Sequence, residues 1–341
     1  MKMFRNDYSE ICHKRVIEAL NDALNEQNVG YGLDKHSENA KKMIQSLIKN
    51  DNASVHFLVG GTQTNMTMIS YALKDYEAVI AVATGHINVH ETGSIESSGH
   101  KILTVTGENG KIRPADIKDV IKNHVDEHMV KPKMVYISNS TEIGTIYKKE
   151  ELEAIYKTCK ENNLFLFIDG ARLASALTSK DNDLTIEDVA KNCDSFYLGG
   201  TKNGLMFGEA LVIINDSLKE DFRFQIKNKG AMLAKGFISG IEFEAILKDN
   251  LYFEIAKGAN DNAYLLSRKL KELGFKVDEV YTNQVFVTCS NDEACFITNN
   301  FGCELWRDLG EEKQVRFVTS FNTRKEDVIE LYNTLKKYLN K

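Results

Sequence analysis

One carboxylate stands directly after a strongly apolar run of the sequence. Asp169 follows the run 164–168, and Gly170 and Arg172 come shortly after it. A strand built from this run would deliver the carboxylate at its C-terminal end, where α/β sheets bind their ligands. For this motif taken alone, an aspartate that only caps the next helix is the more common case.

One lysine stands in a turn made of small residues. Lys202 follows the apolar run 195–198 and lies within Gly199-Gly200-Thr201-Lys202-Asn203-Gly204. The glycines allow a ligand to approach the backbone closely, and a lysine in such a place can form a Schiff base with a carbonyl compound. The alternative is an ordinary solvated lysine, which is the usual state of this residue type.

A pair of glycines joins an apolar run to a helical segment. Gly60, Gly61 and Thr62 stand between the run 55–59 and a helix expected at 63–74. Free N–H groups and the helix dipole at such a start favour a bound phosphate. The sequence here has neither a G-K-[ST] pair nor G-x-G-x-x-G, so a P-loop or a dinucleotide fingerprint is not indicated.

Together, the three features match the needs of pyridoxal 5'-phosphate. A helix start would anchor the phosphate, Asp169 would keep the pyridine nitrogen protonated, and Lys202 would form the Schiff base. A protonated ring acts as an electron sink, which is the property that amino-acid chemistry on this cofactor requires.

The chain resembles the low-specificity L-threonine aldolases of the β-eliminating lyase group, within the fold-type I pyridoxal-phosphate enzymes. The resemblance covers nearly the whole chain and rests on these motifs: Phe4-Arg5-Asn6-Asp7-Tyr8-Ser9, Gly30-Tyr31-Gly32-Leu33-Asp34, Gly61-Thr62 with Asn65, Gly85-His86, Thr141-Glu142-Ile143-Gly144-Thr145, Ile168-Asp169-Gly170-Ala171-Arg172 and Gly200-Thr201-Lys202-Asn203-Gly204. It implies retro-aldol cleavage of L-threonine or L-allo-threonine to glycine and an aldehyde. It also implies a homodimer or homotetramer with its sites at the dimer interface.

The resemblance assigns roles to individual residues. The catalytic residues it implies are Lys202, Asp169 and His86, the last stacked on the cofactor ring. The implied cofactor-binding residues are Gly61, Thr62, His86, Asp169, Arg172, Lys202 and Lys235. The implied substrate-binding residues are Asn6, Tyr31, Arg172 and Arg316, where Arg316 would hold the α-carboxylate with its two-pronged guanidinium. Tyr31 and Lys235 would come from a second subunit.

Two departures from the family pattern leave questions open. Phe237 stands where many relatives have an arginine, and the loop Asn139-Ser140-Thr141-Glu142 lacks the second active-site histidine that some relatives carry after the strand at 135–138. The general base therefore stays open among His86, His90, Glu91 and Glu142. The alternative function is a pyridoxal-phosphate β-elimination lyase acting on cysteine or a related amino acid, and a third is a cofactor-binding protein without useful catalysis.

The apolar pattern predicts the elements that must hold these residues. Strands are expected at 55–59, 79–82, 102–105, 135–138, 164–168, 195–198 and 210–214, with helices at 13–27, 35–49, 63–74, 115–127, 150–162 and 185–191. This alternation favours a mostly parallel sheet covered on both faces, and the family implies about seven strands. A long helical region is expected at 217–272, broken near Gly230, Gly236 and Gly240. It precedes strands at 276–280, 284–288, 304–307 and 315–319 and helices at 291–301 and 325–339.

We therefore expect an α/β fold with two domains. Residues 1–245 would form the large cofactor-binding domain with an N-terminal arm, and residues 246–341 a smaller C-terminal α+β domain. The boundary near 245 would lie inside a helix rather than in a linker.

The composition restricts the class of protein. The chain has 341 residues, 43% of them hydrophobic, and a net charge of −6. The basic excess typical of nucleic-acid or anionic-membrane binding is absent, and no apolar run approaches the ~20 residues of a membrane helix. The six scattered cysteines lack zinc spacing, so no metal site is expected. A polar N-terminus without a secretory core predicts a cytoplasmic protein.

Overall fold

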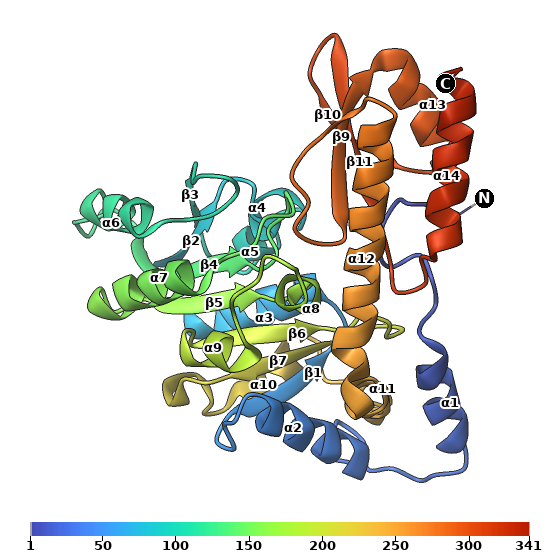
Figure 1. The fold of residues 1–341 in the computed structure, drawn as a ribbon. Helices are drawn as coiled ribbons and strands as arrows, with labels where there is room; N and C mark the ends of the chain where they lie inside the picture. The colour runs from blue at the N-terminus through green and yellow to red at the C-terminus, as the bar shows by residue number, and fades with distance from the viewer. Residues whose placement is uncertain (1, 341) are drawn as a thin grey trace.

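A seven-stranded sheet runs through the larger part of the computed structural model, which describes residues 2–340 (Figure 1). In spatial order the strands are β1 (Ser54–Leu58), β7 (Glu209–Ile213), β6 (Ser195–Gly199), β5 (Phe165–Asp169), β4 (Lys131–Ser138), β2 (Glu77–Val82) and β3 (Ile102–Val105). Neighbouring strands from β3 to β6 are parallel, and β7 is antiparallel to both β6 and β1. The expected mostly parallel sheet is confirmed.

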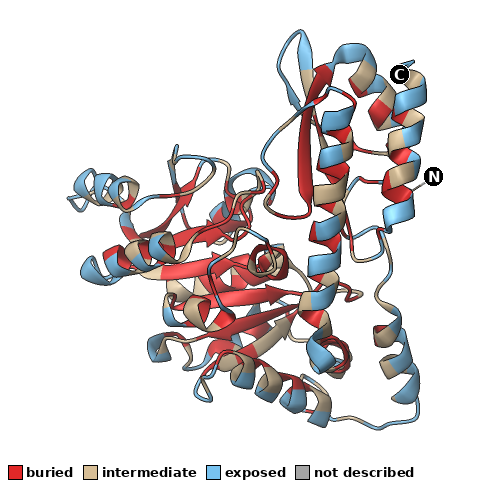
Figure 2. Cartoon of the chain, viewed as in Figure 1, coloured by how far each residue is buried: buried red, intermediate tan, exposed pale blue. Residues whose placement is uncertain are grey.

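Helices cover both faces of this sheet because its strands are apolar on both faces. Along β5, Leu166 and Ile168 pack into one buried cluster, while Phe167 between them packs into the cluster on the opposite face. Figure 2 shows the strands as buried and the helices as exposed on their outer sides. One face is covered by α2 (Lys35–Leu47), α6 (Pro114–Lys122), α7 (Lys149–Glu161), α9 (Ile186–Lys191) and α11 (Phe237–Leu247), and the other by α3 (Gly61–Ala72), α5 (Ser94–Ser97) and α10 (Phe222–Asn228).

The smaller part of the molecule is an antiparallel sheet packed against helices. Its strands lie in the order β10 (Glu304–Asp308), β11 (Glu312–Val318), β9 (Gln284–Ser290) and β8 (Lys276–Val277). The helices α13 (Asn291–Phe301) and α14 (Lys325–Tyr338) contribute Ile297, Phe301, Val328 and Leu331 to its core. Phe4 is fully buried in the same core, so the N-terminal arm crosses to this part of the molecule.

The long helix α12 (Leu251–Glu272) joins the two parts, as Figure 1 shows. Tyr252 and Ala256 at its start belong to the core of the large sheet, whereas Leu266 and Leu270 belong to the smaller core. One continuous helix therefore packs into both cores. The domain boundary near residue 245 stays a prediction.

Several expected elements differ from the structure, among them the helix expected at 115–127, which ends at Lys122. Helix α1 (Lys14–Asp22) ends five residues before the expected end at 27, and the strand expected at 276–280 is reduced to the two residues of β8. Gly240 lies inside α11 and does not break it. A Cβ there would stand 2.5 Å from the backbone nitrogen of Ser37, so the glycine permits the close approach of α11 to α2.

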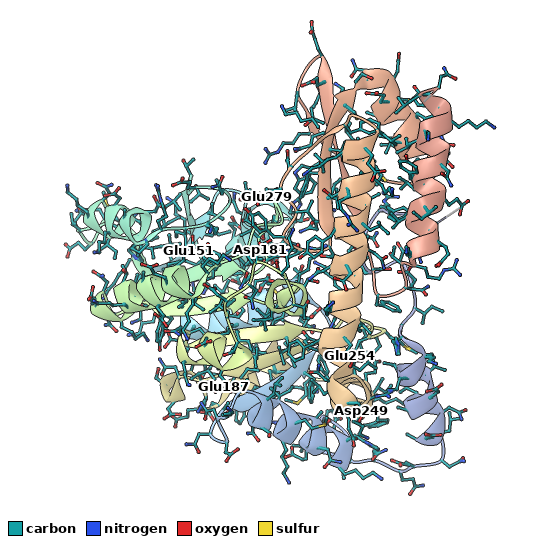
Figure 3. The ribbon with its side chains drawn as sticks, in the orientation of Figure 1. Glu151, Asp181, Glu187, Asp249, Glu254 and Glu279 are labelled. Atoms are coloured by element: carbon teal, nitrogen blue, oxygen red, sulfur yellow. The ribbon has the colours of Figure 1, made fainter. Side chains whose placement is uncertain are left out.

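Ion pairs attach peripheral segments to the body of the protein. Arg15 on α1 pairs with Asp249 at 2.8 Å, and Lys49 pairs with Glu187 at 2.6 Å. Figure 3 labels Asp249 close to the start of α12 and Glu187 on α9. Within residues 2–340, no helix is long and apolar enough to cross a membrane.

Candidate active site

The C-terminal ends of β4, β5 and β6 meet at one edge of the large sheet. The backbone N–H of Asn139 donates to the carbonyl of Asp169 at 3.0 Å, and that of Gly199 donates to the carbonyl of Gly170 at 3.0 Å. A Cβ on Gly170 would lie 1.7 Å from the carbonyl oxygen of Tyr197, so only glycine allows the end of β6 to approach this closely. The glycine of the Asp169-Gly170 motif thus brings the strand-end aspartate and the lysine turn together.

Asp169 is a buried carboxylate with four hydrogen-bond donors. Its Oδ2 accepts from Tyr136 and from the Asn65 amide at 3.0 Å, while Oδ1 accepts from Tyr197 and from the N–H of Ala171 at 3.0 Å. Burial alone would raise the pKa of Asp169, but His86 and the two tyrosine hydroxyls outweigh it, and the pKa lies below its ordinary value. The residue is therefore held as an anion inside the protein.

Lys202 lies in the turn that leaves β6. The turn is fixed by the N–H of Gly200, which donates to the carbonyl of Gly208 at 3.0 Å and to the carboxylate of Glu209 at 2.9 Å. Burial, and then the positive charge of Arg172, lower the pKa of Lys202 below its ordinary value. A lowered pKa favours the neutral amine, which is the nucleophilic form of lysine.

Glu209 is a buried carboxylate near Lys202 that the sequence analysis missed. It opens β7, opposite Leu58 on β1 and Gly199 on β6, and is 3% exposed. Burial raises its pKa to about 8, although hydrogen bonds from Thr201 and Gly200 favour the ionised form. Its contacts make it a support of the turn that carries Lys202.

The start of α3 provides the expected anion-binding site. Gly60 is its N-cap, in extended conformation, and the first residues of the helix are Gly61 and the exposed Thr62. The N–H groups of residues 61–63 have no partner within residues 2–340, as is usual for the first turn of a helix. A Cβ on Gly61 would lie 3.1 Å from the hydroxyl of Tyr197, the same hydroxyl that donates to Asp169. The helix start and Asp169 are therefore separated by little more than one side chain.

His86 begins the short helix α4 (His86–Val89), after β2. Its Nδ1 lies 2.8 Å from Oε1 of Glu91, and its backbone N–H donates to Glu142 at 2.9 Å. The side chain of His86 is 30% exposed, whereas that of Glu91 is fully buried. The ring of His90 is centred 5.6 Å from that of His86.

Arg172 forms a buried ion pair with the N-terminal arm. Its Nε and one terminal nitrogen donate to the two oxygens of Asp7, at 2.7 and 3.0 Å, and Asn283 also donates to Asp7 at 2.9 Å. Burial raises the pKa of Asp7, but the charges of Arg172 and Lys202 bring it below its ordinary value. Arg172 immediately precedes α8 (Leu173–Leu177). Asp7 belongs to one of the sequence motifs, but the resemblance assigned no role to it.

The arm beyond Asp7 also reaches the site. The ring of Tyr8 is centred 6.0 Å from Nζ of Lys202. The side chain of Asn6 accepts from the N–H of Tyr8 at 3.0 Å and from the hydroxyl of Ser9 at 2.8 Å, so it shapes this segment.

Arg316 lies on β11 with its guanidinium against the face of Trp306, 4.4 Å from the ring centre. It donates to Gln284 at 3.1 Å and pairs with Glu304 on the neighbouring strand. Burial, followed by the charges of His86 and Arg316, lowers the pKa of His90. Arg316 is therefore close enough to the His86 region to act on its electrostatics.

Tyr31 and Lys235 lie together, but within this chain they do not join the other site residues. The N–H of Tyr31 donates to the carbonyl of Ala234 at 3.2 Å, and both side chains are exposed. In the part of the chain that the structure describes, neither contacts Lys202 or Asp169 by a hydrogen bond or an ion pair. Phe237, which stands where relatives have arginine, is the first residue of α11 and is partly buried.

Tyr136 and Tyr197 are the other site residues that sequence reasoning missed. Each tyrosine stands two residues before the end of its strand, on the face of the sheet that also carries Phe167. The alternation of side chains along β4 and β6 would have placed their hydroxyls beside Asp169, so this signal was present in the sequence.

Comparisons with known proteins show which family and which fold this chain resembles. The family model described as beta-eliminating lyase matches residues 7–292. The low specificity L-threonine aldolase of Pseudomonas sp. (strain NCIMB 10558) is 33% identical over 336 residues, covering 96% of this chain and 94% of that protein. A solved structure of Leishmania major threonine aldolase matches with a TM-score of 0.97 and 44% identity, over 99% of this chain and 100% of that one. An alanine–glyoxylate aminotransferase from Nostoc sp., with 15% identity and a TM-score of 0.72, shares the fold.

Proposed function

This chain belongs to the beta-eliminating lyase family, and we propose that it is a pyridoxal 5'-phosphate-dependent aldehyde-lyase, an L-threonine aldolase. It cleaves L-threonine or L-allo-threonine to glycine and an aldehyde. The observation that carries the proposal is the buried carboxylate of Asp169 at the end of β5, with the partly buried Lys202 in the turn after the adjoining strand β6 and the start of α3 beside them. The names of the relatives support the substrate class.

The residues of the site fit the cofactor. The N–H groups of Gly61 and Thr62 would bind the phosphate, Lys202 would hold the aldehyde carbon through Nζ, and Asp169 would face the ring nitrogen. When bound, the cofactor supplies a ring that delocalises negative charge from the α-carbon of an attached amino acid. The anionic state of Asp169 suits it to keep a proton on that nitrogen.

The substrate would be oriented by the two arginines. Arg316 would bind the α-carboxylate, with Trp306 and Gln284 holding its guanidinium in place. Arg172 has two of its nitrogens bound to Asp7, which leaves its remaining donors for the cofactor or the substrate. Asn6 would contribute through the arm segment that also carries Tyr8.

His86 is the best placed of the four candidate bases. Glu91 accepts hydrogen bonds from three side chains and is fully buried, so it does not reach a substrate. Glu142 is held by the N–H of His86 and the hydroxyl of Ser138. The Nε2 of His86 has no partner within residues 2–340, so it can accept the proton of the β-hydroxyl group.

The active unit would be at least a homodimer, and it could pair further into a homotetramer. Tyr31 and Lys235 are exposed on the single chain, and the family role expected for them is completion of a neighbouring subunit's site. Large apolar side chains are exposed between residues 11 and 33 and on α10: Ile11, Ile17, Leu24, Val29, Leu33 and Phe224. Mixing a Lys202→Ala variant with a Tyr31→Ala variant should restore partial activity, and full activity of a monomer in sedimentation would contradict the shared site.

A substrate comparison tests the proposed activity. The purified yellow protein should release glycine and acetaldehyde from L-threonine, and borohydride should fix the cofactor to a peptide that contains Lys202. Turnover of cysteine without turnover of threonine would instead favour the β-elimination lyase, and label on another lysine would refute the role of Lys202. The cytoplasmic location is also part of the proposal, and the six cysteines are unpaired in residues 2–340.

A further inference from the structure

We propose that Glu91 and Asn65 are positioning residues that hold His86 and Asp169 together as one hydrogen-bonded unit. His86 lies on α4, Asp169 ends β5, and the segment between α4 and α5 supplies Glu91. The proposal concerns the protein's own hydrogen bonds. It depends on the proposed function only for the kinetic part of its test.

The carboxylate of Glu91 is committed entirely to other protein groups. Its Oε1 accepts from the Asn65 amide at 2.7 Å and lies 2.8 Å from Nδ1 of His86, and its Oε2 accepts from the hydroxyl of Ser94 at 2.7 Å. None of the side chain is exposed. A charge buried in this way must be matched by donors, and here the donors belong to the site.

The amide of Asn65 connects two buried carboxylates. Its nitrogen donates to Glu91 at 2.7 Å and to Asp169 at 3.0 Å, so both of its N–H groups are used. The orientation of the amide is forced, because reversing it would place its oxygen against two carboxylate oxygens. Its Oδ1 is buried and has no partner among the described residues. Such an unpaired oxygen destabilises the folded state, whereas the two hydrogen bonds of the amide nitrogen hold both carboxylates to one side chain.

This arrangement fixes both the orientation and the tautomer of His86. Because a carboxylate only accepts, Nδ1 carries a proton, so that Nε2 is the acceptor of the ring in its neutral form. The backbone N–H of His86 is held separately by Glu142 at 2.9 Å. The ring is thus held through Nδ1 and the backbone through its N–H group, and Asn65 links Glu91 to Asp169.

The test reads the imidazole tautomer directly. In the ¹⁵N-histidine-labelled full-length protein, the ring nitrogens of His86, assigned with a His86→Gln variant, should show the proton on Nδ1. Glu91→Met removes both acceptor oxygens at similar size and should shift His86 away from this tautomer. Glu91→Gln keeps one acceptor and should preserve it. If Glu91→Met does not fold, Glu91→Asp, which is too short to reach both partners, replaces it.

The kinetic part separates positioning from general damage. Glu91→Met should lower kcat for threonine about ten- to hundredfold with KM within about twofold, as for other residues that orient a catalytic group. Asn65→Leu should weaken cofactor binding about tenfold and leave the His86 tautomer unchanged. Thr67→Val is the matched control, because Thr67 is buried on the same helix and its hydroxyl has no partner in residues 2–340.

Two results would overturn the proposal. One is retention of the Nδ1 proton in Glu91→Met or Glu91→Asp, and the other is wild-type cofactor affinity in Asn65→Leu. A wild-type protein that does not cleave threonine, yet shows the expected tautomer changes, would refute the proposed function and leave this inference standing.

Discussion

Replacing Asp7 by asparagine should release the N-terminal arm from the active site. Asp7 is 1% exposed and receives two hydrogen bonds from Arg172, at 2.7 and 3.0 Å, and a third from Asn283 at 2.9 Å. Asp7→Asn removes the negative charge and leaves the guanidinium buried without a counter-ion. Opening of the arm exposes Arg172 to water, so the variant should open more readily than the wild type.

The size of this effect follows from the contacts. Removing one partner of a buried ion pair costs about 3–5 kcal/mol, and a hydrogen bond to a charged group contributes roughly 1.5–3 kcal/mol. Because the asparagine oxygen can still accept one bond, we expect the lower end, about 3 kcal/mol. That corresponds to about a hundredfold increase in the population of the open arm.

Hydrogen exchange measures this population at the arm itself. The N–H of Phe4 donates to the carbonyl of Phe301 at 2.9 Å, and that of Val318 donates to the carbonyl of Phe4 at 2.8 Å. The two amides should exchange about a hundredfold faster in Asp7→Asn, while those of β5 stay protected. Asp51→Asn serves as the control, because Asp51 is exposed and has no ion pair with any residue between 2 and 340. A change of less than about threefold at Phe4 would refute the idea that the Asp7–Arg172 pair holds the arm.

Three further changes test other parts of the structure. Asp169→Asn should retain the cofactor but lower turnover by about a thousandfold or more, because a neutral amide cannot keep the ring nitrogen protonated. A near-wild-type kcat in steady-state kinetics would contradict this role. Arg316→Lys should raise KM for threonine and lower kcat with the cofactor absorbance unchanged, because lysine supplies the charge without the fork, and unaltered kinetics would mean that the carboxylate is bound elsewhere. Burial lowers the pKa of His36, but its contacts with Glu26 at 2.8 Å and Glu244 at 2.7 Å outweigh burial and raise it. The stability that this group contributes is therefore fully present below pH 6.5 and is lost as the pH rises through the higher pKa of the folded state. In denaturant titrations, the difference in free energy of unfolding between the wild type and His36→Gln should shrink across that pH window. A difference that does not depend on pH would refute this role of His36.

The larger helices and strands could be predicted from the sequence because their buried faces give a regular pattern of apolar residues. The strand that ends at Asp169 and the strand that precedes the Lys202 turn are wholly or almost wholly buried, and their continuous apolar runs could be recognised directly. The bounds of α13 match the prediction, and those of α7 lie within one residue of it, since both helices have amphipathic spacing. The start of α13 has a capping box of Ser290 and Glu293, and at the start of α7 Glu151 accepts from the N–H of Lys148.

The elements missed are the short helices that carry the site. α4, α5 and α8 have four or five residues each, which is too few turns for an apolar period to emerge. His86 is the first residue of α4, and Arg172 immediately precedes α8, so their positions depend on tertiary contacts with Glu142 and Asp7. Such contacts between distant segments cannot be read from local pattern.

The roles of charged residues were predictable only in part. The sequence left Glu91 as a candidate base, whereas the structure surrounds it with three donors. The burial of Glu209 and the pairing of Asp7 with Arg172 likewise arise from packing between strands and the arm.

The burial of Phe4 beside Phe301 and Val318 bears on how the protein is made. A ribosome delivers Phe4 long before the strand and helix that enclose it, so this residue has no native partners during most of synthesis. The large sheet can form while the arm is still free, but the smaller core closes only when the earliest and latest segments meet, a contact of very long sequence separation. Because the same arm carries Asp7 to Arg172, the completion of that core and the assembly of the active site are a single late event, and nascent chains should gain neither before release.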